Sequence, residues 1–456
     1  MGFFKAYDMR GTFGTDFDLE TVRKVGLALP QVVGGGRWLV GRDCRVTSQA
    51  VRDALLSGLS AAGAEVTDIG LCTTPMVYFF TAQDGYDGSV MVTASHNPPS
   101  DNGLKVSKRG ALPVGYADGL NEVERLVQAG GPEPARHGET GAAQPAAAGD
   151  ALSRYLDWMR SRAPAGLREL AFAVDCSNGM SSLLVHELFP GAVVVNDGLD
   201  GTFPAHSPNP LRAEAREQLA ALVRERSLDC GVIFDGDADR CMFVDERGEF
   251  VQPDYLIPVV ARATLRQAPC SGGSAPKVIH DVRTSRGAIE ALRRMGCEPV
   301  MVPVGHAFAK PMLRATSALC GGELAGHYYF SEFFGCDSGV LAALRILGEI
   351  ARAKASGRTF SELMRPICGA YANSGELNFR VEDKDAAIGR ALAAAKAELP
   401  AELSRSEMDG VRVEYAEGWL NIRKSNTEPY LRLLVERRGD VGEWVRILRD
   451  AIGRCS

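Results

Sequence analysis

The chain has 456 residues, of which 45% are hydrophobic and 24% are charged, and its 57 acidic and 51 basic side chains give a net charge of −6. This composition supports a large core and excludes a disordered chain. At roughly 150 residues per domain, the length predicts about three domains. The acidic balance, without any run of basic residues, argues against a nucleic-acid partner.

No signal peptide, lipidation motif or apolar stretch of about 18 residues is found, so we expect no membrane attachment and a cytoplasmic location. The 11 cysteines are scattered singly, without a CxxC pair. This spacing fits neither a disulfide scaffold nor a zinc ribbon, and it predicts reduced cysteines that lie mostly in the core.

The same local pattern occurs three times along the chain. Each copy is a short apolar run that ends in Asp, a polar turn, an amphipathic stretch and a second apolar run, and the copies span residues 38–69, 171–195 and 277–302. The amphipathic stretches predict helices at 49–62, 180–188 and 286–295. The pattern is typical of a βαβ unit with parallel strands, because the crossover helix returns the chain to the start of the sheet. Three copies predict three tandem mixed α/β domains.

The pattern changes outside the repeats. Residues 130–150 are rich in Gly, Pro and Ala without periodicity, which predicts a linker or a loose surface loop. After about residue 365, one helix is predicted at 385–398, among strand-like runs at 376–381, 411–415, 419–422 and 431–436. Adjacent strands of this kind predict a smaller α+β domain. The predicted domains are therefore 1–150, 151–252, 253–366 and 372–456.

The first segment with the marks of a reactive site follows an apolar strand that begins at Val90. There Ser95 and His96 precede Pro98 and Pro99, which cannot continue a strand ladder, so we expect an exposed loop at a strand end. Open α/β sheets bind ligands in such loops, at the carboxyl ends of parallel strands. An ordinary Asn-Pro turn is the alternative. A hydrolase serine is not expected, because no GxSxG motif surrounds Ser95.

The second segment places Asp235, Asp237 and Asp239 directly after an apolar strand. Converging carboxylates repel one another by about 4 kcal/mol per pair at about 4 Å and an effective dielectric constant near 20, so their convergence calls for a cation. Oxygen ligands without cysteine favour a hard ion, above all Mg²⁺. A solvated acidic turn is the alternative.

Three other kinds of site match this sequence less well. An EF-hand calcium loop needs Gly at its sixth position, where Arg240 stands, and helices on both sides. A haloacid-dehalogenase-type phosphotransferase has a DxDxT motif, and here Asp239 takes the place of the Thr. A serine site like that of alkaline phosphatase needs several histidine ligands, whereas the seven histidines of this chain are dispersed.

Eight short motifs, in order along almost the whole chain, resemble those of the α-D-phosphohexomutases, and within them the bacterial phosphomannomutase/phosphoglucomutase branch. They are YDMRG at 7–11, GRDCR at 41–45, TASHNP at 93–98, DNGLK at 101–105, DGDADR at 235–240, GH at 305–306, GELAGH at 322–327 and RKSNTEP at 423–429. The resemblance implies a heart-shaped protein in which three mixed α/β domains and a smaller α+β domain surround a central cleft. Each domain contributes one loop to it.

The resemblance also implies a reaction, the reversible transfer of a phosphoryl group between O1 and O6 of mannose phosphates and also of glucose phosphates. Ser95 is expected to carry the phosphoryl group and to form a hexose 1,6-bisphosphate, which turns round before Ser95 takes back the other phosphate. Mg²⁺ is expected between the phosphate on Ser95 and the carboxylates of Asp235, Asp237 and Asp239, where it neutralises charge on the transferred group.

Further roles follow from the same resemblance. A cationic and hydrogen-bonding group is expected around the phosphoserine: Arg10, His96, Lys105 and Arg240. Lys105 and His327 are candidates for proton transfer with the sugar hydroxyl. The sugar phosphate is expected to contact Tyr7 at the entrance, Arg283, His306, Glu323, Ala325 and His327. The distal phosphate is expected to be gripped by Arg423, Ser425, Asn426 and Thr427.

Two positions depart from the family's pattern. Ala325 stands where the sugar-reading loop usually has a Ser, which removes one hydroxyl donor, and Arg283 stands where a Lys is common. The preference between mannose and glucose therefore stays open. Glu323 and His327 favour these sugars over glucosamine. The two alternatives are a glucosamine-phosphate mutase and a catalytically silent regulator that binds sugar phosphates. A monomer or a weak dimer is expected.

Overall fold

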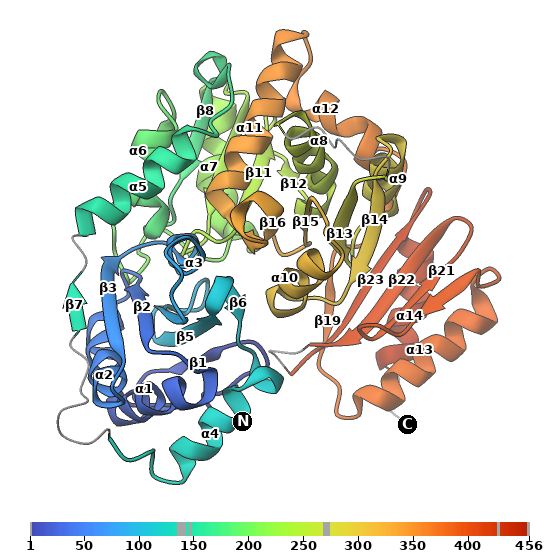
Figure 1. The fold of residues 1–456 in the computed structure, drawn as a ribbon. Helices are drawn as coiled ribbons and strands as arrows, with labels where there is room; N and C mark the ends of the chain where they lie inside the picture. Colours follow the sequence, from blue (N-terminus) through green and yellow to red (C-terminus); the bar gives the residue numbers. More distant parts are fainter. Residues whose placement is uncertain (1, 135–142, 146–147, 268–273, 426–428, 454–456) are drawn as a thin grey trace.

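The computed structural model describes residues 2–134, 143–145, 148–267, 274–425 and 429–453. These residues form four β-sheets that follow one another around the molecule in chain order (Figure 1). The first three sheets mix parallel and antiparallel pairs, and the fourth is antiparallel throughout. The predicted architecture of three mixed α/β units and a smaller α+β unit is thus confirmed. Among the described residues, no helix has both the length and the apolar character that crossing a membrane requires.

The first unit is built on a seven-stranded sheet. Its elements are β1 (Met9–Thr12), α1 (Leu19–Val33), β2 (Arg37–Arg42), α2 (Ser48–Ala61), β3 (Glu65–Leu71), α3 (Thr74–Gln83), β4 (Gly88–Val92), β5 (Asp101–Lys108), β6 (Leu112–Pro113), α4 (Leu120–Gln128) and β7 (Ala143–Pro145). Alternate strand residues point to opposite faces. Trp38 and Val40 of β2 therefore share a core with α1, α2 and α4, whereas Leu39 faces α3.

The second and third units each have a five-stranded sheet. The second comprises α5 (Ala148–Arg160), β8 (Phe172–Asp175), α6 (Val185–Leu188), β9 (Val193–Val195), α7 (Ala213–Glu225), β10 (Cys230–Phe234), β11 (Cys241–Asp245) and β12 (Phe250–Val251). The third comprises α8 (Ile257–Gln267), β13 (Lys277–Asp281), α9 (Arg286–Arg294), β14 (Glu298–Val302), α10 (His306–Ala315), β15 (Cys320–Gly322), β16 (Tyr328–Phe330), β17 (Cys336–Asp337), α11 (Gly339–Ala355) and α12 (Phe360–Cys368).

The three mixed sheets share one strand order. The order is β5-β4-β2-β3 in the first, β11-β10-β8-β9 in the second and β16-β15-β13-β14 in the third. In each sheet the first strand of this order is antiparallel, and the other three are parallel to one another. One hairpin turn of each sheet therefore lies at the carboxyl ends of its parallel strands.

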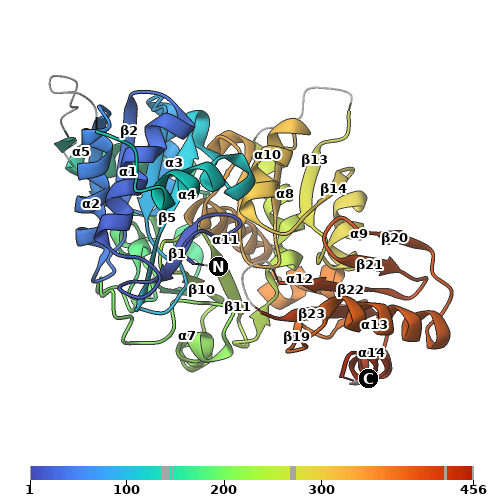
Figure 2. The same ribbon diagram turned by 90° about the horizontal axis from the view of Figure 1, so that it is seen from below.

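The fourth unit is an antiparallel sheet with two helices. It comprises β18 (Ala372–Asn373), β19 (Leu377–Phe379), α13 (Lys384–Glu398), β20 (Ser404–Ser406), β21 (Val411–Glu414), β22 (Gly418–Lys424), β23 (Leu431–Arg437) and α14 (Gly442–Gly453). Figure 2 shows this sheet beside α9. Arg286, the first residue of α9, donates hydrogen bonds to the carbonyls of Tyr415 and Gly418, both at 2.8 Å. This contact joins the third unit to the fourth.

Two local predictions are wrong. Residues 130–150 are not all a loose loop, because β7 pairs in parallel with β3 and α5 begins at Ala148. β7 is an edge strand, which is where a sheet tolerates a residue such as Pro145. The helix predicted at 180–188 is a 3₁₀ turn, Met180–Leu183, followed by the short α6. There the Ser182 hydroxyl donates to the Gly179 carbonyl, which favours a local turn over a continuous helix.

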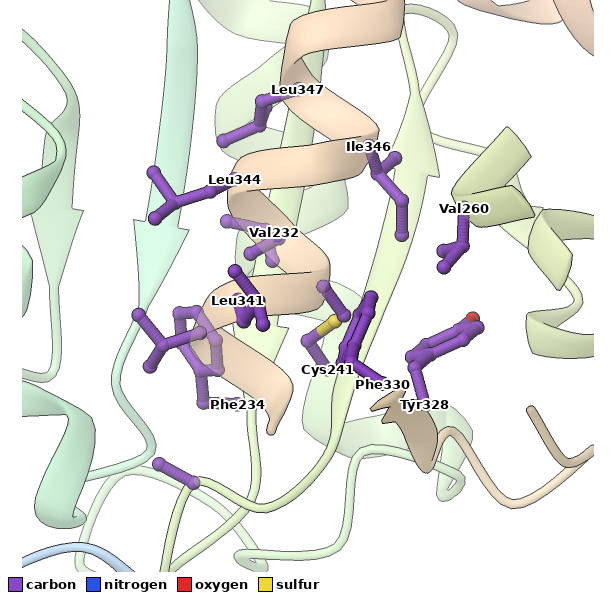
Figure 3. Packing of buried hydrophobic residues seen from close by; sticks show 14 of the residues in the cluster. Val232, Phe234, Cys241, Val260, Tyr328, Phe330, Leu341, Leu344, Ile346 and Leu347 are labelled. Carbon is purple, nitrogen blue, oxygen red and sulfur yellow. The ribbon is translucent and has the colours of Figure 1, made fainter. Parts of the chain in front are cut away.

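The main core joins the second and third units through α11. All but three of the 17 residues of this helix are buried, including Arg345 and Glu349, which pair with Glu332 and Arg262. Figure 3 shows Leu341 and Leu344 of α11 near Val232 and Phe234 of β10, with Phe330 of β16 beside the helix. A helix of the third unit thereby fixes the position of the second sheet.

Helices α1 and α2 touch through two glycines. A Cβ atom on Gly58 would lie 2.1 Å from the Arg23 carbonyl oxygen, and one on Gly26 would lie 2.6 Å from the Leu55 carbonyl oxygen. Both distances are too short for any side chain. The first unit therefore depends on glycine at these two positions for the spacing of its helices.

We expect Gly58→Ala to destabilise the first unit by about 1–3 kcal/mol, because the added methyl group must push α1 and α2 apart. The change is measured as the shift of the earliest transition in urea-induced unfolding. Gly389→Ala in α13 is the matched control, since its Cβ would meet open space. This control should stabilise the chain slightly, by about 0.5–1 kcal/mol. Equal effects of the two substitutions would contradict the close helix contact.

Candidate active site

A cavity of about 630 Å³ lies where the four units meet. This volume is within the usual range for a small-molecule site. Its lining includes all but five of the predicted site residues: Tyr7, Arg10, Ser95, His96, Lys105, Arg240, Arg283, His306, Glu323, Ala325, His327, Arg423 and Ser425. Asp235, Asp237 and Asp239 are buried next to it. Asn426 and Thr427 lie outside the described residues.

The shared strand order explains why distant segments meet here. The Ser95 loop joins β4 to β5, the turn 235–240 joins β10 to β11, and the turn 323–327 joins β15 to β16. Each is the hairpin turn at the carboxyl ends of the parallel strands of its sheet. Ligand sites of open α/β sheets form at this edge. The three mixed sheets thus each contribute the equivalent turn.

Arg45 stabilises the backbone of the Ser95 loop. Its guanidinium group is buried and donates to the backbone carbonyls of Ser95, Asn97, Pro98 and Asp101, at 2.6–2.9 Å. These bonds support an unusual conformation, because Ser95 has φ of 51°. A non-glycine residue in this region is strained and persists only where its surroundings enforce it. The loop is therefore rigidly presented.

Ser95 is buried, with 3% of its surface exposed, and not on an exposed loop as expected. The second unit covers it. The Ser95 hydroxyl donates to Asp235 Oδ2 at 2.8 Å, and Arg240 Nη2 donates to Ser95 Oγ at 3.3 Å. His96 Nδ1 lies 3.2 Å from the same oxygen. Burial, together with Arg240 and Arg10, holds the pKa of His96 well below its usual value, so this imidazole is neutral at pH 7.

The three predicted metal ligands form one cluster. Their nearest carboxylate oxygens all lie within 4.8 Å of one another. Lys105 Nζ donates to Asp237 Oδ2 at 2.7 Å and to Asp239 Oδ2 at 2.6 Å. Within the described part of the chain, Oδ1 of Asp237 and Oδ1 of Asp239 accept no hydrogen bond. Unpartnered buried carboxylate oxygens and an all-oxygen donor set fit a hard divalent cation.

The aspartates of the cluster differ in how readily they ionise. Burial raises the pKa of Asp235, against the lowering effect of Arg240. Burial would also raise the pKa of Asp239, but Lys105 and His327 hold it below its usual value. Asp235 is therefore hard to ionise, whereas Asp237 and Asp239 are ionised. This state is expected of a cation site before the cation binds.

His327 is oriented by a buried ion pair. Its Nδ1 lies 2.7 Å from Asp337 Oδ2, and the other oxygen of Asp337 lies 2.8 Å from Lys310 Nζ. Lys310 in turn lies 3.5 Å from the centre of the Tyr78 ring. The carboxylate fixes the proton of His327 on Nδ1, which leaves Nε2 to exchange a proton with a ligand.

The predicted sugar contacts gather at the third unit. The Glu323 carboxylate accepts from the Tyr329 hydroxyl and from the Gly305 backbone N–H at 3.2 Å. His306 packs edge-on against Tyr7, with ring centres 6.1 Å apart. Tyr7 comes from the first unit and donates to the Val304 carbonyl at 3.2 Å. Ala325 lines the cavity beside these groups.

Arginines dominate one part of the cavity lining. Arg423 and Ser425 of the fourth unit lie there, with Arg283 of the third. Arg423 is buried and donates to Glu376 at 3.0 Å. Arg432, directly opposite Arg423 in the strand register, donates to the other oxygen of Glu376 at 2.9 Å. This arrangement can bind an anion that displaces or joins the carboxylate.

Sequence reasoning missed several residues of the site. They are Arg45, Lys310, Asp337, Glu376 and Arg432. Arg45 belongs to the GRDCR motif. Its position just after a predicted strand is the only feature of the sequence that could have indicated a place in the site. Nothing in the local pattern around Asp337 or Glu376 indicates which side chain from a distant segment it meets.

The chain matches four family models that together cover nearly all of it. Phosphoglucomutase/phosphomannomutase alpha/beta/alpha domains I, II and III match residues 1–132, 153–248 and 252–371, and the phosphoglucomutase/phosphomannomutase C-terminal domain matches 376–451. The domain limits predicted from the sequence alone stay a prediction.

Curated relatives agree with the family models. A protein named phosphohexose mutases from Xanthomonas campestris is 39% identical over 446 residues, which is 96% of this chain and 95% of the relative. A phosphomannomutase from Salmonella montevideo is 36% identical over 448 residues, with the same coverage of each chain. The crystal structure of a phosphoglucomutase/phosphomannomutase family protein from Burkholderia thailandensis matches with a TM-score of 0.84 and 29% identity, over 100% of this chain and 98% of that one. The chain belongs to the phosphoglucomutase/phosphomannomutase family and is a phosphohexose mutase.

Proposed function

We propose that this enzyme moves a phosphoryl group between O1 and O6 of mannose phosphates, and also of glucose phosphates, by way of a phosphoserine at Ser95 and a hexose 1,6-bisphosphate. One observation carries the proposal. A buried serine hydroxyl at the end of the cavity lies 2.8 Å from a carboxylate of a three-aspartate cluster, although the two come from different sheets. Among the described residues, Ser95 has the only hydroxyl that both lines the cavity and donates to this aspartate cluster.

The reaction needs a donor that serves both ends of the sugar, since O1 and O6 lie too far apart for direct transfer. Ser95 Oγ gives its phosphoryl group to the free hydroxyl of the hexose monophosphate and is left as the alcohol. After the bisphosphate has turned round, Ser95 Oγ attacks the other phosphorus, the P–O bond to the sugar breaks, and the product leaves. Arg240 and Lys105 place positive charge where the transferred oxygens gather.

Asp235, Asp237 and Asp239 would hold a divalent cation, for which Mg²⁺ is the best match to their oxygen donors. Such an ion supplies a Lewis acid that neutralises charge on the transferred phosphoryl group. The rigid Ser95 loop contributes separately, because the four bonds from Arg45 keep the oxygen aimed at the cluster. Positioning of this kind accounts for a large part of catalysis in phosphoryl transfer.

Proton transfer is assigned to His327, with Asp337 as the residue that orients it. The sugar hydroxyl loses its proton as it attacks, and Nε2 of His327 is the acceptor that its bond to Asp337 leaves available. Lys105 is less suited, since its ammonium is shared between Asp237 and Asp239. The ionised partners raise the pKa of Lys105 despite its burial, so it stays protonated.

The distal phosphate is assigned to Arg423 and Ser425, with Arg432 and Arg283 beside them. Asn426 and Thr427 belong to the same predicted grip. Glu323, His306 and Tyr7 would contact the sugar, and Ala325 offers it no hydroxyl donor.

Glucosamine-phosphate mutase remains the second candidate. A cytoplasmic location and a monomeric or weakly dimeric state also remain predictions.

Ser95→Ala should lower turnover by a factor on the order of 10⁴ or more, since nucleophile loss has effects of this size in other enzymes. Substrate binding, measured by calorimetry, should persist. The intact mass of the parent protein should show a phosphoryl adduct that is stable to acid and to hydroxylamine and is absent from the variant. Ser100→Ala, at an exposed position of the same loop, is the control. Near-normal turnover of Ser95→Ala would reduce Ser95 to a turn residue.

Chelation of divalent ions should abolish turnover, and MgCl₂ should restore it. MgCl₂ should also raise the unfolding temperature of the chelated protein, because an ion that binds only the folded state stabilises it. Asp237→Asn should weaken this stabilisation, with Mg²⁺ affinity reduced on the order of 10- to 100-fold. Asp157→Asn on the exposed side of α5 is the control. An unchanged Mg²⁺ response in Asp237→Asn would exclude the cluster as the binding site.

Coupled assays with mannose, glucose and glucosamine 1-phosphates, each primed with the matching bisphosphate, test the substrate. We expect turnover of the first two sugars and at least about tenfold lower kcat/KM for glucosamine. Preferential turnover of glucosamine 1-phosphate would establish the second candidate. No turnover of any sugar would leave only a binding protein.

A further inference from the structure

Two arginines stand directly opposite each other at the end of the cavity. Arg423 of β22 and Arg432 of β23 are partners in the antiparallel register, so their side chains leave the same face of the sheet. Like charges in this relation destabilise a strand pair. A neighbouring anion is therefore needed when no ligand is bound.

Glu376, which directly precedes β19, supplies this anion. One carboxylate oxygen accepts from Arg423 at 3.0 Å and lies 3.5 Å from Arg283, and the other accepts from Arg432 at 2.9 Å. Burial opposes its ionisation, but the three guanidinium groups lower the pKa of Glu376 to about 2. The carboxylate is therefore charged at neutral pH. It also lines the cavity.

The combined charge of Arg423, Arg432 and Glu376 does not balance that of a phosphate monoester. Arg283 is already engaged by Asp281, to which it donates at 2.6 and 3.1 Å. Arg423 and Arg432 carry two positive charges, and the Glu376 carboxylate offsets one of them. A phosphate monoester near pH 7 carries a charge of about −1.5 to −2. Two arginines alone would match this charge, so Glu376 makes the arginine pair weaker for phosphate than it could be.

We propose that Glu376 sets how tightly the arginine pair holds the distal phosphate, so that the sugar bisphosphate leaves this position and turns round within the cavity. The inference rests on the proposed function. A phosphate that binds there competes with the Glu376 carboxylate for the same N–H groups. Release is favoured because the carboxylate returns to the arginines as the phosphate departs. A mutase must bind and release a phosphate at this end in every cycle, so the tightest possible grip would be a disadvantage.

Glu376→Gln tests the charge with little change of shape. In a Ser95→Ala background, which prevents turnover, calorimetry should show inorganic phosphate and glucose 6-phosphate binding at least about tenfold more tightly than to Ser95→Ala alone. In the enzyme with Ser95 intact, KM and kcat should fall together, because release of the phosphate becomes slow. A residue that only organised the arginines would instead raise KM.

Three further variants complete the test. Glu414→Gln is the matched control, since Glu414 pairs with Arg286 and Arg412 at the same boundary between units, and phosphate affinity should stay unchanged. Glu376→Asp keeps the charge and should bind phosphate no more tightly than the parent, a comparison that stands even if Glu376→Gln folds poorly. Arg423→Gln should abolish the binding.

The outcomes separate the two proposals. Equal or weaker phosphate binding by a folded Glu376→Gln, or tighter binding by Glu376→Asp, would overturn the role of Glu376. If Arg423→Gln loses phosphate while Glu376→Gln binds as the parent does, only this inference fails. If Arg423→Gln leaves phosphate binding intact, the assignment of the distal phosphate to this end of the cavity is wrong, and the inference fails with it.

Discussion

The structure depends on the docking of the turn 235–240 onto the Ser95 loop. The two backbones touch so closely that a Cβ atom on Gly236 would lie 2.5 Å from the Ser95 carbonyl oxygen. The bond from the Ser95 hydroxyl to Asp235 and the bond from the Thr74 backbone N–H to the Asp237 carbonyl, at 3.1 Å, cross the same boundary. Neither unit alone contains both Ser95 and the three aspartates. The arrangement of whole sheets therefore decides whether the chemistry exists.

This docking is possible because one topology is used three times. Since each mixed sheet places an equivalent hairpin turn at the carboxyl ends of its parallel strands, sheets arranged around a common centre bring these turns together. The fourth sheet follows other rules and contributes a different group, the opposed Arg423 and Arg432. In the proposed function, the mixed sheets supply the reacting groups and the sugar contacts, and the antiparallel sheet supplies cations for the distal phosphate.

Local patterns predicted the repeated βαβ units, the change of class in the last unit and the segments of Ser95 and of the three aspartates, because periodicity and turn residues are properties of short segments. The segments around Arg283, Glu323 and Arg423 were expected only from the family resemblance. The burial of Ser95 could not be predicted, since another unit covers it. The pairing of Asp337 with His327 and of Glu376 with Arg423 lies within single units, but it joins separate segments, so local patterns could not indicate it. The helix expected at 180–188 failed for a local reason, competition from the Ser182 hydroxyl, which residue propensities describe only on average.

The ion pair between Lys105 and Asp237 has a consequence for biosynthesis. The two residues are 132 positions apart, and at translation rates of about 5–20 residues per second the carboxylate leaves the ribosome roughly 7–26 seconds after the ammonium. A buried ammonium without a counter-charge is costly, so β5 of the nascent first unit must keep Lys105 hydrated during that interval. Final closure of the N-terminal third of the protein therefore awaits synthesis of the middle.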